Sequence, residues 1–232
     1  MPAVLDNYDA VLKRINVACL RAGRSPADIR LLPVTKYARA EDIFTLLTNR
    51  DIFAAAESRL QDSLAKWNQP PLNALKVKKI FIGQLQSNKT QKVLENFDVI
   101  ASLSSLDIAK RLDTQAAKLG KKANCLVQIK LTDRQTQSGA DIQNAAALIK
   151  AARKDCANIN LQGLMAIAPI VEDAEQLRPV FKEVKKFFDD NFAQGAYLSL
   201  GMSGDFEVAV EEGSNLPRVG GLIFNTENTD DN

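Results

Sequence analysis

The chain has 232 residues, of which 46% are hydrophobic and 25% charged, and its net charge at neutral pH is +2. This is the composition of a globular protein that can supply a full core, and the small net charge points to neither a nucleic-acid nor a membrane partner. The sequence contains no histidine, which excludes histidine-based catalytic triads, histidine general bases and histidine metal ligands. We expect no metal site.

The number and spacing of the cysteines indicate whether the protein works in a reducing or an oxidising cellular compartment. The three cysteines are widely spaced, which is not the even, regular set of a disulfide framework, and free thiols suit a reducing compartment. No charged-then-apolar leader opens the chain, and no apolar run approaches the ~20 residues of a membrane helix. These features predict a cytoplasmic protein.

A first amphipathic helix is predicted over residues 5–21, with Tyr8, Leu12, Ile15 and Cys19 on one face and Gly23 after its end. The eight strand candidates that follow are 29–35, 52–56, 79–82, 99–103, 124–131, 160–167, 196–200 and 218–224. The helix candidates between them are 40–49, 58–67, 87–96, 105–119, 141–156, 172–192 and 205–212.

Strands that alternate with helices indicate βαβ units and a parallel sheet. Eight such strands in this length favour a single (β/α)8 TIM barrel with an extra N-terminal helix, over residues 1–225. The alternative is a doubly wound sheet, which would usually carry a G-x-G-x-x-G turn after an early strand, and none is present. The leading helix would cover the barrel floor or pack on its side. Residues 226–232 form a polar tail.

A lysine follows the first strand candidate. In an α/β barrel the active site lies at the carboxyl ends of the strands, so Lys36 would stand at the barrel mouth. A partly desolvated amine there can form a Schiff base with an aldehyde. The alternative is a solvated lysine at the end of a strand.

Glycines and a serine occur at strands seven and eight, and the loops after these two strands are the usual phosphate site of such barrels. Gly201, Ser203, Gly220 and Gly221 could present backbone N–H groups and a hydroxyl to an anion. The alternative is ordinary turn chemistry. A lysine beside a phosphate cup suits a phosphorylated aldehyde, either pyridoxal 5′-phosphate (PLP) or a sugar phosphate bound by a class I aldolase.

Two further polar positions fall at strand ends. Arg218 could face the pyridine nitrogen of PLP and disfavour its protonation, because two positive charges would meet there. A structural salt bridge is the alternative. In the segment after strand three, Ser87 is expected to cap the next helix, and Asn88 and Lys89 either face the site or lie on the surface.

The sequence resembles the PLP homeostasis proteins, relatives of the barrel domain of alanine racemase. The resemblance covers nearly the whole chain. It is carried by Leu32-Pro33-Val34-Thr35-Lys36, the run from Phe81 through Gly83-Gln84 to Asn88-Lys89, Gln137-Ser138-Gly139, Gly163-Leu164-Met165-Ala166-Ile167, and Leu198-Ser199-Leu200-Gly201-Met202-Ser203 with Asp205.

The resemblance implies that Lys36 holds PLP as a Schiff base and that Arg218 faces the pyridine nitrogen. It places Met202, Ser203, Gly220 and Gly221 around the phosphate and Ser58 near the 3-hydroxyl side of the ring. The sequence departs from the family pattern at several positions, two of which fall among the expected site residues. Ser58 stands where the family has asparagine, and Gly221 where it has threonine, so the chain loses an amide and a hydroxyl at the site. Both departures allow weaker PLP binding.

The resemblance implies a protein that binds and buffers PLP in the cell, has no established catalysis and hands PLP to apoenzymes, and we expect a monomer. A weak amino-acid racemase is the alternative, which would need acid–base groups on both faces of the substrate carbon. The candidates for a second group are Tyr8, Tyr37 and Tyr197. Strand alternation predicts that Tyr37 points away from Lys36.

Overall fold

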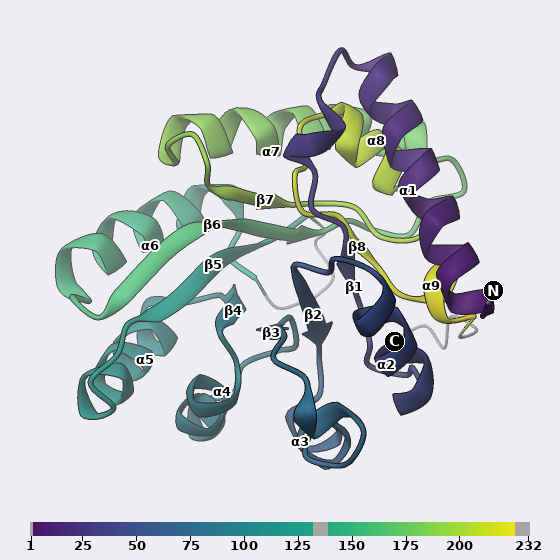
Figure 1. The fold of residues 1–232 in the computed structure, drawn as a ribbon. Coiled ribbons are helices and arrows are strands. Elements are labelled where there is room, and N and C mark those ends of the chain that lie inside the picture. The colour runs from purple at the N-terminus through teal and green to yellow at the C-terminus, as the bar shows by residue number, and fades with distance from the viewer. Residues whose placement is uncertain (1, 132–138, 226–232) are drawn as a thin grey trace.

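The computed structural model describes residues 2–131 and 139–225, where short strands alternate with helices (Figure 1). The strands are β1 (Leu32–Pro33), β2 (Ala54–Glu57), β3 (Lys78–Phe81), β4 (Val99–Leu103), β5 (Ala123–Lys130), β6 (Ile159–Ile167), β7 (Tyr197–Ser199) and β8 (Arg218–Val219). The α-helices are α1 (Ala3–Arg21), α2 (Ala40–Asn49), α3 (Leu60–Trp67), α4 (Thr90–Asn96), α5 (Leu106–Lys118), α6 (Ile142–Asp155), α7 (Arg178–Asn191), α8 (Phe206–Glu211) and α9 (Gly221–Phe224). Short 3-10 turns are η1 (Pro26–Asp28), η2 (Leu72–Ala74), η3 (Ser87–Lys89) and η4 (Ala174–Leu177).

The strands pair in parallel in the order of the chain. One continuous ladder runs from β2 to β7, and β8 pairs with β1. Two seams, β1–β2 and β7–β8, join these groups into a closed (β/α)8 barrel, which confirms the predicted fold class. The predicted tail 226–232 lies outside the described residues, as do Gln137 and Ser138.

The β1–β2 seam is thin because of a proline. Leu32 N and Val34 N both donate at 2.9 Å to carbonyls on the β8 side. Since consecutive N–H groups of a strand point to opposite sides, the missing N–H of Pro33 falls on the side of β2. There the strands share one bridge, between Val34 and Ala56, and Thr35 N donates to Ala56 O at 2.9 Å.

The β7–β8 seam relies partly on side chains. Leu198 O accepts from Asn215 N at 3.0 Å and from Leu216 N at 3.2 Å. The buried hydroxyl of Ser214 accepts from Leu200 N at 3.2 Å and donates to Leu200 O at 2.7 Å. Side-chain hydrogen bonds therefore replace part of a regular ladder at this seam.

The barrel interior is filled by alternate strand residues. Its buried apolar side chains include Leu32, Ala54, Ala56, Ile80, Ala101, Leu126, Met165 and Leu216. The intervening strand residues pack outward against the helices. The interior is thus a packed core, and a ligand can reach only its mouth.

Helix α1 packs on the side of the barrel, one of the two expected positions. It lies alongside α8 and α9 (Figure 1), where Tyr8 and Ile15 share a core with Phe206 and Ile223. Within the described ranges, none of the helices is long and apolar enough to cross a lipid bilayer.

The predicted eighth strand is wrong beyond Val219. Residues Gly221–Phe224 form helix α9, because the backbone of Gly220 leaves the extended conformation at φ −120° and ψ −71°. The helix ends at Asn225, which adopts the left-handed conformation at φ 50°. Asparagine tolerates this conformation better than most residues.

Candidate functional site

The predicted site residues gather at one end of the barrel. Lys36 follows β1, Ser58 follows β2, Ser203 follows β7 and Gly220 follows β8. These four strands are neighbours around the barrel, and their carboxyl ends point the same way because all strand pairs are parallel. The structure therefore brings together segments that lie far apart in the sequence.

Lys36 is half-buried in a turn that follows β1. Its Nζ lies 4.7 Å from the centroid of the Tyr37 ring, a cation–π contact. The prediction that Tyr37 points away from Lys36 is therefore wrong. Alternation holds only within a strand, and β1 ends at Pro33, so residues 36 and 37 lie in the turn. Arg59 Nη2 donates to the Tyr37 hydroxyl at 3.2 Å.

A buried ionic cluster lies behind Lys36, and the sequence did not reveal it. Glu57 is fully buried, and its Oε1 accepts from Thr35 Oγ1 at 2.7 Å, from Lys66 Nζ at 2.7 Å and from Trp67 Nε1 at 2.9 Å. Lys66 Nζ also donates to Thr35 O. Glu57 Oε2 accepts no hydrogen bond from any residue in the described part of the chain.

The Gly201–Asp205 loop after β7 is held by internal hydrogen bonds. Met202 N donates to Asp205 Oδ1 at 2.5 Å, and Phe206 N donates to Met202 O at 2.9 Å. Burial raises the pKa of Asp205, while the N–H of Met202 and the charge of Arg218 oppose the shift. Ser203 is half-buried in this loop and precedes α8, whose first N–H groups have no partner within the helix.

The loop after β8 lies directly against β1. A Cβ added at Gly220 would stand 3.0 Å from Val34 O, so the backbone there approaches the strand that carries Lys36. Gly221 opens helix α9. The loop that begins at Gly220 thus lies against the segment that leads into Lys36, and the prediction that it binds an anion remains a prediction.

Arg218 is buried inside the barrel, with 4% of its surface exposed. Its Nη1 donates to Ser199 O at 2.8 Å and to Ser199 Oγ at 2.9 Å, and its Nη2 donates to Ala166 O at 3.0 Å. Burial lowers the pKa of Arg218 to about 10, partly offset by Asp205. The alternative for Arg218 was a structural salt bridge, and in the described residues its side chain instead makes hydrogen bonds to β7 and β6, with Asp205 as a nearby charge.

Ser58 and the segment after β3 form another part of the rim. A Cβ at Gly83 would overlap Ser58 O at 1.8 Å, so the two loops are in contact. Ser87 does not cap α4 as predicted, because it begins the 3-10 turn and its carbonyl accepts from Thr90 Oγ1 at 3.0 Å. Asn88 is exposed and Lys89 half-buried, beside an open hollow of about 490 Å³.

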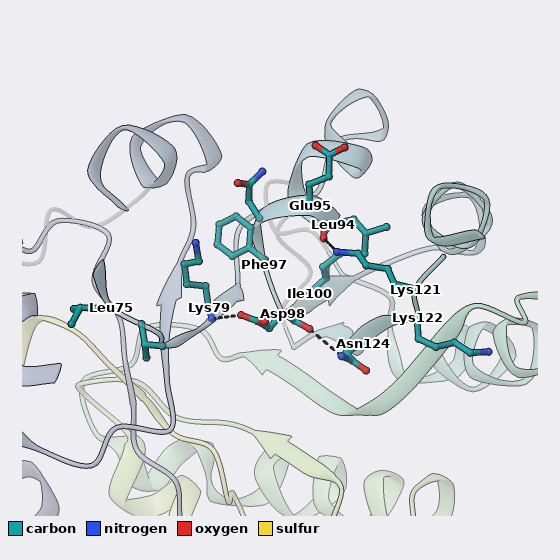
Figure 2. A pocket seen from close by; sticks show the side chains of 12 residues that line it. Leu75, Lys79, Leu94, Glu95, Phe97, Asp98, Ile100, Lys121, Lys122 and Asn124 are labelled. Carbon is teal, nitrogen blue, oxygen red and sulfur yellow. Dashed lines mark hydrogen bonds between the residues drawn. The ribbon is translucent and has the colours of Figure 1, made fainter. Parts of the chain in front are cut away.

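A recess of about 460 Å³ lies at the opposite end of the barrel, near the starts of β3, β4 and β5 (Figure 2). Its polar groups already serve the fold. Lys121 Nζ donates to Leu94 O, and Lys79 N donates to Asp98 Oδ2 at 2.8 Å. Because ligands of α/β barrels bind at the carboxyl ends of the strands, we locate the candidate site at the Lys36 end.

Only one of the three tyrosines, which all lie in the described residues, is close to Lys36. Tyr8 lies in the core beneath α1, and Tyr197 opens β7 at the far end, 5.7 Å from Phe53 between ring centroids. Tyr37 alone of the three neighbours Lys36. This end of the barrel therefore carries the Lys36 amine, the glycine loop after β8 and the buried guanidinium of Arg218 on neighbouring strands, a combination that fits a phosphorylated aldehyde.

Sequence comparison relates the chain to proteins of known families. The family model of the alanine racemase N-terminal domain matches residues 10–228. The pyridoxal phosphate homeostasis protein of Pseudomonas aeruginosa is 34% identical over 230 residues, which cover 97% of this chain and 96% of that protein.

Structural comparison gives the same relationship. PipY of Synechococcus elongatus, solved with PLP bound, has a TM-score of 0.75 and 30% identity, and the match covers 92% of this chain and 99% of that chain. Alanine racemase of Clostridium difficile has a TM-score of 0.71 at 19% identity, over 98% of this chain and 58% of that chain. The racemase shares the barrel fold.

Proposed function

Because this chain belongs to the pyridoxal phosphate homeostasis protein family, we propose that it binds PLP and holds it through a covalent bond to Lys36. The observation that carries this proposal is the position of Lys36, which is half-buried and lies two residues beyond Val34, the residue that the Gly220 loop approaches. The bound PLP of PipY supports it, since that protein matches nearly the whole chain. Lys36 Nζ is the nucleophile that forms a C=N bond with the aldehyde, and one water leaves.

The phosphate would be held by the loops after β7 and β8. Ser203 supplies a hydroxyl, and the backbone at Gly220 and Gly221 supplies N–H groups at the start of α9. Met202 would line the site beside Ser203, with its own N–H donated to Asp205. Ser58 would line the rim on the other side of Lys36. The loops are already fixed by hydrogen bonds within the chain, so little ordering is needed on binding.

Arg218 would face the pyridine nitrogen from within the barrel. PLP supplies an electrophilic aldehyde and, when its ring nitrogen is protonated, an electron sink. A cationic Arg218 disfavours a second positive charge beside it, and its hydrogen bonds to Ser199 and Ala166 keep it in place. The residue therefore restrains carbanion chemistry, which suits a protein that stores the cofactor.

We further propose a cytoplasmic, monomeric protein that keeps free PLP low and passes it to PLP-dependent apoenzymes. A covalent but reversible bond would suit both roles. The aldehyde would be masked while bound, and addition of water across the C=N bond would return free PLP and the Lys36 amine. Lys36 and Ser203 are only half-buried, which leaves them accessible for exchange.

Absorption spectroscopy tests the proposal. Purified protein mixed with PLP is expected to develop a visible band from the C=N bond, and Lys36→Ala is expected to lack it. Lys122→Ala is the matched control, because Lys122 lines the recess at the opposite end of the barrel (Figure 2) and donates there to Ala157 O. Its loss should leave the band intact. A wild-type protein without the band, or a band that survives in Lys36→Ala, would refute the assignment.

A further inference from the structure

The buried cluster behind Lys36 concentrates donors on one carboxylate oxygen. Glu57 Oε1 accepts hydrogen bonds from the hydroxyl of Thr35, the ammonium of Lys66 and the indole N–H of Trp67, all at 2.9 Å or less. Glu57 is fully buried, and the Lys66 side chain is 15% exposed. Charge-assisted hydrogen bonds of this kind are the strong ones.

Such a cluster is poorly explained by stability alone. Removing two charges from water costs about as much as their attraction returns, so apolar residues of similar volume would serve a core equally well. Glu57 Oε2 adds to the cost, because it is buried and accepts no hydrogen bond within the described ranges. The cluster therefore calls for a reason besides packing.

The cluster acts on the residue that precedes Lys36. Thr35 is held at three of its atoms. Its N donates to Ala56 O, its Oγ1 donates to Glu57, and its carbonyl accepts from Lys66. The same carbonyl accepts from Ala38 N at 3.1 Å, which closes the turn that contains Lys36 and Tyr37.

The backbone that leads into Lys36 is held by these hydrogen bonds of Thr35 and not by a strand ladder. The ladder of β1 stops at Pro33, and Pro33 cannot donate a hydrogen bond toward β2. Beyond it the backbone depends on the bridge at Val34 and on the contacts of Thr35. A turn held only by its own backbone would leave the direction of the Lys36 side chain loosely defined.

We propose that Glu57 is a positioning residue, which fixes the Lys36 turn through Thr35 and Lys66 and so makes Lys36 competent to bond PLP. The inference rests on the proposed function, because it needs a covalent bond at Lys36. It predicts that loss of the cluster lowers the covalent fraction of bound PLP more than it lowers PLP binding itself, since the loops of Ser203 and Gly220 do not depend on Glu57.

The test uses Thr35→Val and Glu57→Gln, with Thr35→Ser as the conservative variant that keeps the hydroxyl. Each protein is saturated with PLP, the C=N bond is trapped with borohydride, and the trapped fraction is measured by intact mass beside total bound PLP. We expect Thr35→Val and Glu57→Gln to lose about tenfold in the equilibrium between covalent and non-covalent PLP, the size of one charged hydrogen bond. Thr35→Ser should restore it.

Glu207→Gln is the matched control, because it breaks an exposed ion pair between α1 and α8, Arg14 with Glu207 at 3.0 Å. Its trapped fraction should equal that of the wild type. Equal trapped fractions in Thr35→Val and wild type would refute the positioning role and leave the proposed function standing, and this variant decides the case should Glu57→Gln fail to fold. A wild type that traps no PLP on Lys36 would instead refute the proposed function, and the inference with it.

Discussion

Two glycines of the loop after β7 give a sharp test of how this part of the site is built. Gly201 has a φ of +89°, and a Cβ added there would lie 2.7 Å from both Ala209 Cβ and Phe206 Cα. Gly204, three residues on, has no atom within 4 Å of an added Cβ. Gly201→Ala should therefore strain the loop, whereas Gly204→Ala should be tolerated.

The magnitudes follow from two separate costs. A left-handed backbone costs a non-glycine residue about 1–2 kcal/mol, and overpacking against the backbone of α8 adds about 1–3 kcal/mol. A loss near 3 kcal/mol corresponds to a fall in Tm of about 6–12 °C for a chain of this size. Gly204→Ala should change stability by less than about 1 kcal/mol and in the stabilising direction, because it restricts the unfolded chain.

Urea unfolding measures the free energy of unfolding of each variant, and titration with PLP measures its affinity for PLP. Gly201→Ala should also weaken PLP binding, because Met202 and Ser203 follow directly and would move with the loop. Equal stability of the two variants would show that the left-handed conformation at residue 201 is not required. Normal PLP affinity in a destabilised Gly201→Ala would show that the loop after β7 does not hold the phosphate.

Three further outcomes are expected. Arg218→Leu leaves buried carbonyls on β7 and β6 without their donor and should cost about 2 kcal/mol, or about 4–8 °C in Tm; an unchanged Tm would contradict this. Arg50 holds the pKa of Asp9 below its ordinary value of 3.8, so Asp9→Asn should lower the urea midpoint at neutral pH. That difference should shrink below pH 3.8, because a depressed carboxyl pKa contributes stability that is lost as pH falls through the folded-state value. PLP at a hundredfold excess over Kd should raise the free energy of unfolding by about 2.7 kcal/mol, and Lys36→Ala should lose most of that gain in a thermal scan.

The alternation of elements could be predicted from the sequence because each strand is a short apolar run between amphipathic stretches. The strand 99–103 was predicted with its observed bounds, and the helix 40–49 likewise. The placement of Lys36 and Gly220 at neighbouring strand ends also followed, since parallel strands all end at the same face. These predictions needed only local pattern and the topology of the fold.

The errors arose where local pattern is ambiguous. The apolar run Gly-Leu-Ile-Phe at 221–224 was predicted as the end of a strand, but it forms a helical turn. An apolar run of this length is equally compatible with a strand and a helix. The orientation of Tyr37 depended on where β1 ends, and the proline at residue 33 was the available signal. Glu57 lies one residue beyond the predicted strand 52–56, although β2 includes it. It could not be predicted as a buried ion, because its partners Lys66 and Trp67 come from the following helix.

The candidate site lies where the barrel is least regular. On either side of the β8–β1 pair, the backbone ladder thins to one bridge or a few hydrogen bonds, and side chains complete the closure. Ser214 and Arg218 do so at β7–β8, and Thr35 and Glu57 do so at β1–β2. A regular backbone ladder would set the positions of these strand ends whether or not a ligand binds there. Here, polar side chains set the position of the Lys36 turn and that of the Gly220 loop separately. The irregular seams and the cofactor site are thus two aspects of one arrangement, in which closing the barrel and positioning Lys36 depend on the same hydrogen bonds.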